Sequence, residues 1–502
     1  MSLRNAASMP GVSLSRMFLA LALASLLSSQ ESRPELARTL EPALAELVRR
    51  FRLPGLALGV VQRGEVIYAR GFGETSRGSG RPVTPHSVFH MASVSKVFTA
   101  SAAMQLVEAG KLELDAPLTK YLPYFRLADE ASTTITVRQA LTHTSGFPDV
   151  EDYQWEKPQH DAGAAERYVR SLASERMVFA PGRGSRYSNM AFDTLGDVIA
   201  KAAGMPFEDY VKSHILVPLG MAQSSFIHAE TPTELRTQGH STIYSQRVDQ
   251  APCPVYPYNR RHAPSSTLNS NVVDMCRFAL ANLARGELDG QRILAAKSYD
   301  LLWSRDDDTP EIGLGWSLGN LAGRPTVSHS GADVGYNSYL LLLPSENLGV
   351  VVMIHSDVSP VGDVARAAAL AALGEPFTFP RPRISFEFAH LLENEGFEAA
   401  SERFFELQET ESGKWTFGFA ELDEVCDALL QLERNDAAVE LATLNADVHP
   451  EVCAAFTRLG QALLAAGDGE GAREHFEHAL ELTPNDAAAR AGLKALGPTG
   501  GR

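Results

Sequence analysis

Hydrophobic positions follow two different patterns along the first three quarters of the chain. Leucines at helical spacing across residues 34–51 predict an amphipathic helix. Apolar runs at 56–61 and 66–70 flank an Arg-Gly pair and predict a β-hairpin. From about residue 112 to 319 the pattern is mostly helical, with long loops. Strand patterns then return, followed by one more helical pattern; the strands cover 326–329, 339–343 and 348–354, and the helix covers 361–373.

Strand patterns at both ends of this region, with helices between them, predict its topology. We expect an α/β fold in which the N- and C-terminal segments form one antiparallel sheet with flanking helices and an inserted helical lobe. Pockets commonly form between lobes, so we expect an active site there. The loops at 150–175 and 239–265 are expected to shape it.

The last quarter of the chain differs in character. A proline-rich linker at 376–383 separates a domain at 34–375 from an all-helical region at 384–502. That region resembles tetratricopeptide repeats, which implies either a protein-binding surface or a helical stabiliser packed on the first domain. The linker predicts that few contacts cross the boundary. The matching positions are Phe456, Leu459, Gly460, Leu463, Ala472, Phe476 and Pro484.

Ser93 and Lys96 form a Ser-x-x-Lys pair at the start of a buried helical pattern. On a helix, residues three apart share a face, so both side chains would point into one pocket. A serine hydroxyl needs a base to act as a nucleophile, and a lysine serves when burial or a neighbouring cation lowers its pKa. Taken alone, the pair also fits an ordinary helix start capped by serine.

Two further motifs carry polar groups suited to the same chemistry. Tyr187 and Asn189 lie where a Gly/Pro-rich loop meets a helical pattern. A tyrosine can relay protons, a nearby cationic lysine would favour its phenolate, and an asparagine can hold an acyl group with both donor and acceptor. His329, Ser330 and Gly331 lie on or beside a predicted strand, where a substrate could lie against the backbone. The alternatives are a helix cap and a turn between strands.

The order of the three motifs resembles that of serine β-lactamases and penicillin-binding proteins. The chain holds one Ser-x-x-Lys and one Tyr-x-Asn, followed by a basic residue and Ser-Gly. Segments at 54–60, 141–149 and 313–316 are similar to the class C and esterase-like branch of that family. The resemblance covers roughly residues 35–375.

This resemblance implies a serine hydrolase that works through an acyl-enzyme, with no metal and no cofactor. Ser93 would attack a carbonyl, and Lys96 and Tyr187 would share the base and acid roles. The substrate-binding residues implied are Asn189, His329, Ser330, Gly331 and Ala332, and the backbone N–H groups of Ser93 and Ala332 would form the oxyanion hole.

The substrate is left open by two departures from the penicillin-degrading members. They usually carry lysine where this chain has His329, and the middle motif is Tyr-x-Asn rather than Ser-Asp-Asn. Esters, amides or D-amino-acid peptides are the expected substrates, with β-lactams possible in principle. Two other hypotheses are a penicillin-binding sensor with slow or no turnover and a scaffold that binds partners through its repeats.

Composition limits the partners and the location. A net charge of −16 argues against nucleic acid, and the four scattered cysteines lack zinc-ligand spacing. We therefore expect a small-molecule or peptide acyl substrate and a protein partner for the repeats. An apolar run at 17–27 behind two arginines fits a signal peptide within residues 1–33, which predicts export to the periplasm or medium. A cytoplasmic protein with an unstructured leader is the alternative, and no other segment is a membrane-span candidate.

Overall fold

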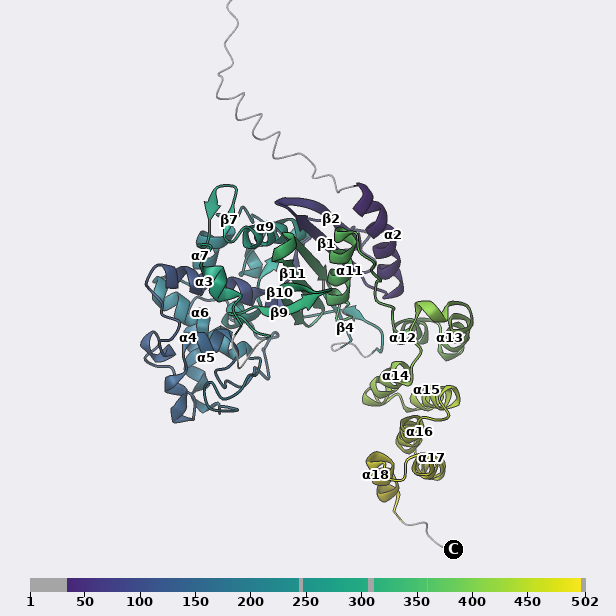
Figure 1. Ribbon diagram of the computed structural model, residues 1–502. Coiled ribbons are helices and arrows are strands. Elements are labelled where there is room, and N and C mark those ends of the chain that lie inside the picture. The colour runs from purple at the N-terminus through teal and green to yellow at the C-terminus, as the bar shows by residue number, and fades with distance from the viewer. Residues whose placement is uncertain (1–33, 243–246, 306–310, 359, 498–502) are drawn as a thin grey trace, which may run out of the picture.

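The computed structural model describes residues 34–242, 247–305, 311–358 and 360–497. The expected leader at 1–33 lies outside the described residues. Figure 1 shows three parts: a β-sheet flanked by helices, a helical lobe beside it, and a row of helices that descends from the sheet lobe to the C-terminus. Within the described residues, no helix is both long and apolar enough to cross a membrane.

The sheet is antiparallel throughout, with strand order β2-β1-β12-β11-β10-β9. The predicted hairpin and the three predicted later strands are confirmed, and the edge strand β9 is an addition. The bounds are β1 Gly55–Gln62, β2 Glu65–Gly73, β9 Ser317–Leu321, β10 Arg324–Asp333, β11 Tyr336–Leu343 and β12 Leu348–Ile354. An early strand of this domain, β1, therefore pairs with its last strand, β12, as the pattern predicted.

Helices cover both faces of the sheet, which explains why its central strands are apolar on both sides. Alternate residues of β1 and β12, such as Leu58 and Val352, pack against α2 (Pro34–Arg50) and α11 (Val361–Leu373). Their neighbours in the strands pack toward α9 (Val272–Leu283) on the opposite face. Both α2 and α11 match the helices predicted from leucine spacing and from the final helical pattern.

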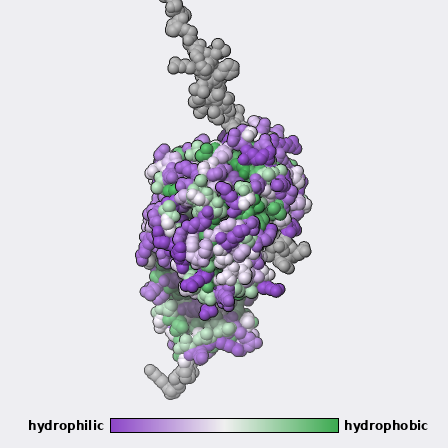
Figure 2. All heavy atoms as spheres, turned by 90° about the vertical axis from the view of Figure 1, so that its left-hand side faces the viewer, coloured by the Kyte–Doolittle hydropathy of each residue, from purple (hydrophilic) through white to green (hydrophobic). Residues whose placement is uncertain are grey.

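The helical lobe is inserted between β2 and β9. Its centre is α3 (Ser95–Glu108), which is almost entirely buried because neighbouring helices surround it. The nearest of these is α6 (Asn189–Ala203), which begins at the cap Ser188 and ends at Gly204. The other helices are α4 Val137–Leu141, α5 Ala164–Ser171, α7 Phe207–Val211, α8 Ala263–Ser266 and α10 Ser298–Leu302. The short strands are β3 Phe89–His90, β4 His240–Ser241, β5 Ala251–Pro252, β6 Asn269–Ser270, β7 Glu287–Leu288 and β8 Gln291–Arg292. Figure 2 shows the outer face of this lobe as a mosaic of polar and apolar residues.

Within residues 384–497, seven α-helices follow the linker, and consecutive ones pack against each other except α13 and α14, which pack on α15 and α12 respectively. Gly460 of α16 permits one such contact, because a Cβ there would lie 2.6 Å from the Phe476 ring of α17. The thiols of buried Cys426 and half-buried Cys453 each lie close to a backbone carbonyl of the following helix. The bounds are α12 Ile384–Asn394, α13 Phe397–Glu411, α14 Phe419–Gln431, α15 Asn435–Val448, α16 Cys453–Ala465, α17 Gly469–Leu482 and α18 Ala487–Leu496.

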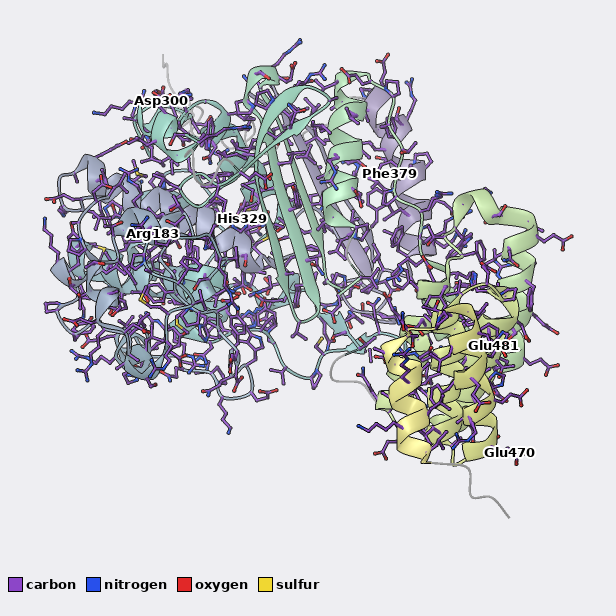
Figure 3. All side chains as sticks on the ribbon, turned by 60° about the horizontal axis from the view of Figure 1, so that its bottom comes forward. Arg183, Asp300, His329, Phe379, Glu470 and Glu481 are labelled. Carbon is purple, nitrogen blue, oxygen red and sulfur yellow. The ribbon has the colours of Figure 1, made fainter. Side chains whose placement is uncertain are left out.

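A small set of specific side-chain contacts crosses the linker. Arg52, just after α2, forms an ion pair of 2.7 Å with Glu387 of α12, and the Phe51 and Phe386 rings pack 6.0 Å apart. Asp249 also accepts from His390 of the same helix at 2.8 Å. Pairs this distant in sequence leave no local signal, so the proline-rich pattern could not identify these contacts. Figure 3 shows Phe379 of the linker beside α11, where it packs on the core beneath α2.

Candidate active site

Ser93 lies on a single 3₁₀ turn, Ala92–Val94, that connects β3 to α3. Ala92 has a φ of +46°, a left-handed conformation that costs free energy in a residue with a Cβ. The turn is fixed from both sides: Ser95 Oγ accepts from the Leu268 amide at 2.9 Å, and Ser338 Oγ donates to the Met91 carbonyl at 2.7 Å. Strain held by such contacts is common at nucleophiles, and here it points the serine into a cavity.

Lys96 lies one turn further along, at the start of α3, and is fully buried. Its Nζ lies 3.0 Å from Ser93 Oγ, 2.5 Å from Asn189 Oδ1 and 2.8 Å from the Ser265 carbonyl. Three acceptors match the three donors of an ammonium group, so its position is fixed. The predicted convergence of Ser93, Lys96 and Asn189 is present.

Burial lowers the pKa of Lys96 to about 7, against the partial opposition of the carboxylates of Asp193, Asp333 and Asp149. Burial disfavours the charged form of an amine, and the carboxylates favour it. At neutral pH a substantial fraction of Lys96 is therefore the free amine, which can accept a proton from the hydroxyl 3.0 Å away.

Asp149 sets the orientation of Asn189. Its carboxylate accepts from the Asn189 backbone amide at 2.8 Å and from the side-chain Nδ2 at 3.1 Å. The amide oxygen is thereby turned toward Lys96. Ser188 forms a second contact between the start of α6 and the segment at 141–149. Its hydroxyl donates to the Pro148 carbonyl at 2.6 Å and accepts from the Ala191 amide.

The segment at 141–149 thus acts as a clamp on the Tyr-Ser-Asn turn. His143 accepts from the Ser188 amide at 3.1 Å through Nδ1, and its carbonyl accepts from the Arg186 amide at 2.9 Å. Burial and the nearby Lys96 hold the pKa of His143 well below its usual value, so the ring is a neutral acceptor. This explains physically why the segment accompanies the catalytic motifs.

Tyr187 lies over the nucleophile, with its side chain hydrogen-bonded to that of Ser93. Lys96 Nζ lies 4.8 Å from the centroid of its ring, over the face rather than at the hydroxyl. Although Tyr187 is 41% exposed, desolvation of its hydroxyl raises its pKa, and the hydrogen bond from Ser93 only partly opposes this, so the shift runs against the phenolate that the nearby lysine would favour. Tyr187 is therefore a phenol at neutral pH, suited to donating a proton or a hydrogen bond.

Gly331 allows strand β10 to pass directly beside the Ser93 turn. A Cβ on Gly331 would lie 2.2 Å from the Met91 carbonyl oxygen and 2.5 Å from Ser338 Oγ. Only glycine fits this approach, which brings the next residue, Ala332, to the wall of the cavity that contains Ser93. Ser330 lines the same wall.

His329 is not among the residues that line this cavity. It is 6% exposed, donates from Nδ1 to the Ser330 carbonyl at 2.6 Å and packs 6.4 Å from the Tyr187 ring. Burial and the nearby Lys96 lower the pKa of His329 to about 3, so the ring is neutral at physiological pH. Figure 3 shows His329 at the boundary between the sheet and the helical lobe. It supports Tyr187 rather than lining the cavity.

The cavity has a volume of about 340 Å³. The sequence motifs missed three of its residues: Tyr153, which comes from one of the loops expected to shape the pocket, Ser266 at the end of α8, and Asp333 at the end of β10. Asp333 stands two positions beyond Gly331 in a strand, and that spacing was the one available signal. The full lining is Ser93, Tyr153, Tyr187, Asn189, Ser266, Ser330, Ala332 and Asp333.

A larger cavity, of about 630 Å³, lies between the sheet lobe and α12, lined by residues such as Phe51, Asp357 and Arg383. The smaller cavity is the candidate active site because the Ser93 and Lys96 pair opens into it. Among the described residues, no cluster of three or more histidine, cysteine or acidic side chains is arranged to hold a metal ion.

Residues 40–375 match the family model described as Beta-lactamase, which covers the whole sheet and helical lobe. The chain belongs to the Beta-lactamase family. Its antiparallel sheet with an inserted helical lobe is the Beta-lactamase fold, and the family places it in the serine hydrolase superfamily. The motifs described above all fall inside the matched residues.

Relatives within this family carry different names. The chain is 31% identical over 318 residues to Penicillin-binding protein 4 of Amycolatopsis lactamdurans, which covers 61% of this chain and 82% of the relative. It is 35% identical over 217 residues to Esterase EstB of Burkholderia gladioli, spanning 39% of this chain and only about half, 53%, of the esterase. Among solved structures, an octameric penicillin-binding protein homologue from Pyrococcus abyssi has a TM-score of 0.59 and 26% identity, covering 71% of this chain and 81% of that one.

Proposed function

We propose that this protein is a serine hydrolase that cleaves an ester, amide or D-amino-acid peptide bond through an acyl-enzyme on Ser93. The observation that carries the proposal is the 3.0 Å hydrogen bond between Ser93 Oγ and a buried Lys96 whose pKa is lowered to about 7. A neutral lysine in contact with a serine is a nucleophile and base pair ready for acyl transfer.

In the first half-reaction, Ser93 Oγ forms a bond to the substrate carbonyl carbon as its proton moves to Lys96 Nζ. The backbone N–H groups of Ser93 and Ala332 stabilise the oxyanion. When the tetrahedral intermediate collapses, the bond to the leaving group breaks and Tyr187 relays a proton from Lys96 to that group. Water then attacks the carbonyl carbon of the acyl-enzyme, and its proton passes through Lys96 and Tyr187 to Ser93 Oγ. The bond from Ser93 to the acyl group breaks, which releases the acid and free Ser93.

Esters are expected to be better substrates than β-lactams. A β-lactam carries a carboxylate, and a lysine at the position of His329 would complement it. Here that position holds a neutral imidazole that does not line the cavity. The cavity wall instead carries Asp333, whose carboxylate disfavours an anionic substrate.

The test is labelling with a serine-reactive fluorophosphonate and with a fluorescent penicillin, followed by peptide mapping. We expect fluorophosphonate on the Ser93 peptide, abolished in Ser93→Ala and retained in Ser101→Ala, a matched change further along the same helix. Short-chain p-nitrophenyl esters should show a higher kcat/KM than nitrocefin. Absence of label on Ser93 would contradict the proposed nucleophile. A higher kcat/KM for nitrocefin than for every ester would contradict the proposed preference for esters.

A second candidate is a penicillin-binding sensor, favoured by the similarity to Penicillin-binding protein 4 over 82% of that protein. A sensor acylates at Ser93 but deacylates slowly. A burst of one product equivalent per protein followed by negligible turnover would support the sensor over the hydrolase.

For the C-terminal helices, we propose tetratricopeptide-like repeats that bind a protein partner, in a domain beginning near residue 384. Support comes from the successive packed helices and from the Gly460–Phe476 contact at repeat positions. A pull-down with the region after Pro376, compared with residues 34–375, tests this. We also propose export through the segment at 1–33, which N-terminal sequencing of the mature protein tests.

A further inference from the structure

Asp333 is a carboxylate in the wall of the active-site cavity with no role in the acyl-transfer steps above. It ends strand β10, one residue after Ala332, and 10% of its side chain is exposed. Side chains alternate along a strand, so Asp333 points to the same face as Gly331, toward the Ser93 turn. Its contacts agree with this direction, because they lie on β3 and α8 beside that turn.

One oxygen of Asp333 is held and the other is left for the cavity. His90 Nε2 donates to Oδ2 at 2.8 Å, and Ser266 Oγ donates to the same oxygen. Among the described residues, no hydrogen-bond donor is present for Oδ1. A carboxylate held through one oxygen is fixed in orientation and keeps the lone pairs of the other oxygen for a ligand.

Among the described residues, no lysine or arginine forms an ion pair with Asp333, and its one such contact is with His90. His90 is fully buried between the rings of Tyr256 and Tyr336, and its Nδ1 has no partner within the described part of the chain. The contact with Asp333 is therefore the one hydrogen bond of the His90 ring to a carboxylate within the described residues. Lys96, on which the Asp333 charge acts, makes its three hydrogen bonds to other acceptors.

The other residues that line the cavity are uncharged: serines, tyrosines, an asparagine and an alanine. The cavity therefore presents a single fixed negative charge beside the nucleophile. A buried carboxylate with a free oxygen favours a cationic donor and disfavours an anion, because the cavity screens charge poorly.

We propose that Asp333 binds the ammonium group of the substrate, so that the site takes aminoacyl esters, amides or peptides with a free amino group. This rests on the proposed hydrolase function. An α-ammonium lies two bonds from the scissile carbonyl carbon. Asp333 is the residue next to the expected oxyanion donor Ala332, about 3.4 Å along the strand, so one substrate can reach both.

The experiment compares alanine ethyl ester with N-acetylalanine ethyl ester, each as the D and the L enantiomer, in full-length protein. Release of the free acid gives kcat/KM for each ester. For the preferred enantiomer we expect wild-type protein to favour the free amine by at least about tenfold. Asp333→Asn should remove that preference while retaining hydrolysis of the acetylated ester. Asp300→Asn, an exposed aspartate on α10 far from the cavity, should keep the preference (Figure 3).

A second measurement needs only the wild-type protein, in case Asp333→Asn folds poorly. Above about pH 8 an α-amino group loses its proton and its attraction to a carboxylate. The ratio of kcat/KM for the free amine to that for the acetylated ester should therefore fall as pH rises through that value. Ionisations of Lys96 cancel in this ratio because both substrates use the same base.

The inference is overturned if wild-type protein cleaves the acetylated esters as well as the free amines, or if folded Asp333→Asn keeps the full preference. In either result, loss of acetyl-ester hydrolysis in Ser93→Ala shows that the hydrolase proposal itself still stands. If no ester is cleaved and fluorophosphonate does not label Ser93, the hydrolase proposal fails and this inference fails with it.

Discussion

Gly331→Ala should separate the geometry of the oxyanion hole from the presence of the nucleophile and base. The added Cβ would start 2.2 Å from the Met91 carbonyl oxygen. An ordinary contact needs at least 3.4 Å, so β10 and the Ser93 turn must separate by about 1 Å. Both partners are backbone or buried, so no flexible side chain can absorb the shift.

That separation increases the distance between the Ala332 N–H and the Ser93 turn, while the Ser93, Lys96 and Tyr187 side chains are all retained. Loss of one oxyanion donor costs about 10²- to 10³-fold in kcat, and we expect a fall of that size on p-nitrophenyl acetate. Labelling of Ser93 by fluorophosphonate should slow in proportion. Overpacking also costs about 1–3 kcal/mol of stability, which thermal unfolding measures separately.

The matched control is Gly413→Ala, where a Cβ meets nothing within 4 Å and φ is not positive. It should leave kcat unchanged. A folded Gly331→Ala protein with wild-type kcat would refute the argument that this glycine places the oxyanion donor.

Three further outcomes are expected. The kcat/KM for neutral esters should rise with pH and level off above about pH 7, as Lys96 loses its proton. Lys96→Met should lower activity by about 10³-fold or more and remove this pH dependence. A kcat/KM that does not change with pH in wild-type protein would exclude Lys96 as the base. Tyr187→Phe should lose about 10²-fold, less than Ser93→Ala, and a wild-type rate across pH 6 to 9 would remove the phenol from the mechanism. A chain cut after Glu375 should keep ester turnover, because its active-site cavity is intact. Its melting temperature should be about 5 °C lower, because the Phe51–Phe386 and Arg52–Glu387 contacts are lost. An insoluble or inactive product would show that the C-terminal helices hold the first domain together.

Local patterns in the sequence predicted most of the fold. The hairpin at β1 and β2, the strands β10 to β12 and the helices α2 and α11 follow from periodicity and turn residues, and they are present close to the expected bounds. Strand β9 was missed because Ser317–Leu321 is short, partly polar and at the edge of the sheet, where apolar alternation is weakest.

The candidate site was predictable only as far as side-chain motifs reach. Ser93, Lys96 and Asn189 meet because three motifs flank one cavity. The Ser265 carbonyl that completes the Lys96 contacts is a backbone group with no side-chain signal. The orientations of His329 and Asp333 depend on which face of β10 meets the helical lobe, and that is set by tertiary packing rather than by local sequence.

The most direct test of the central claim is the intact mass of the protein, quenched during turnover of a slowly hydrolysed ester and followed by peptide mapping. The account predicts a mass increase equal to one acyl group minus one hydrogen, located on the peptide that contains Ser93 and absent from Ser93→Ala. An adduct on another residue, or full turnover by Ser93→Ala, would contradict it.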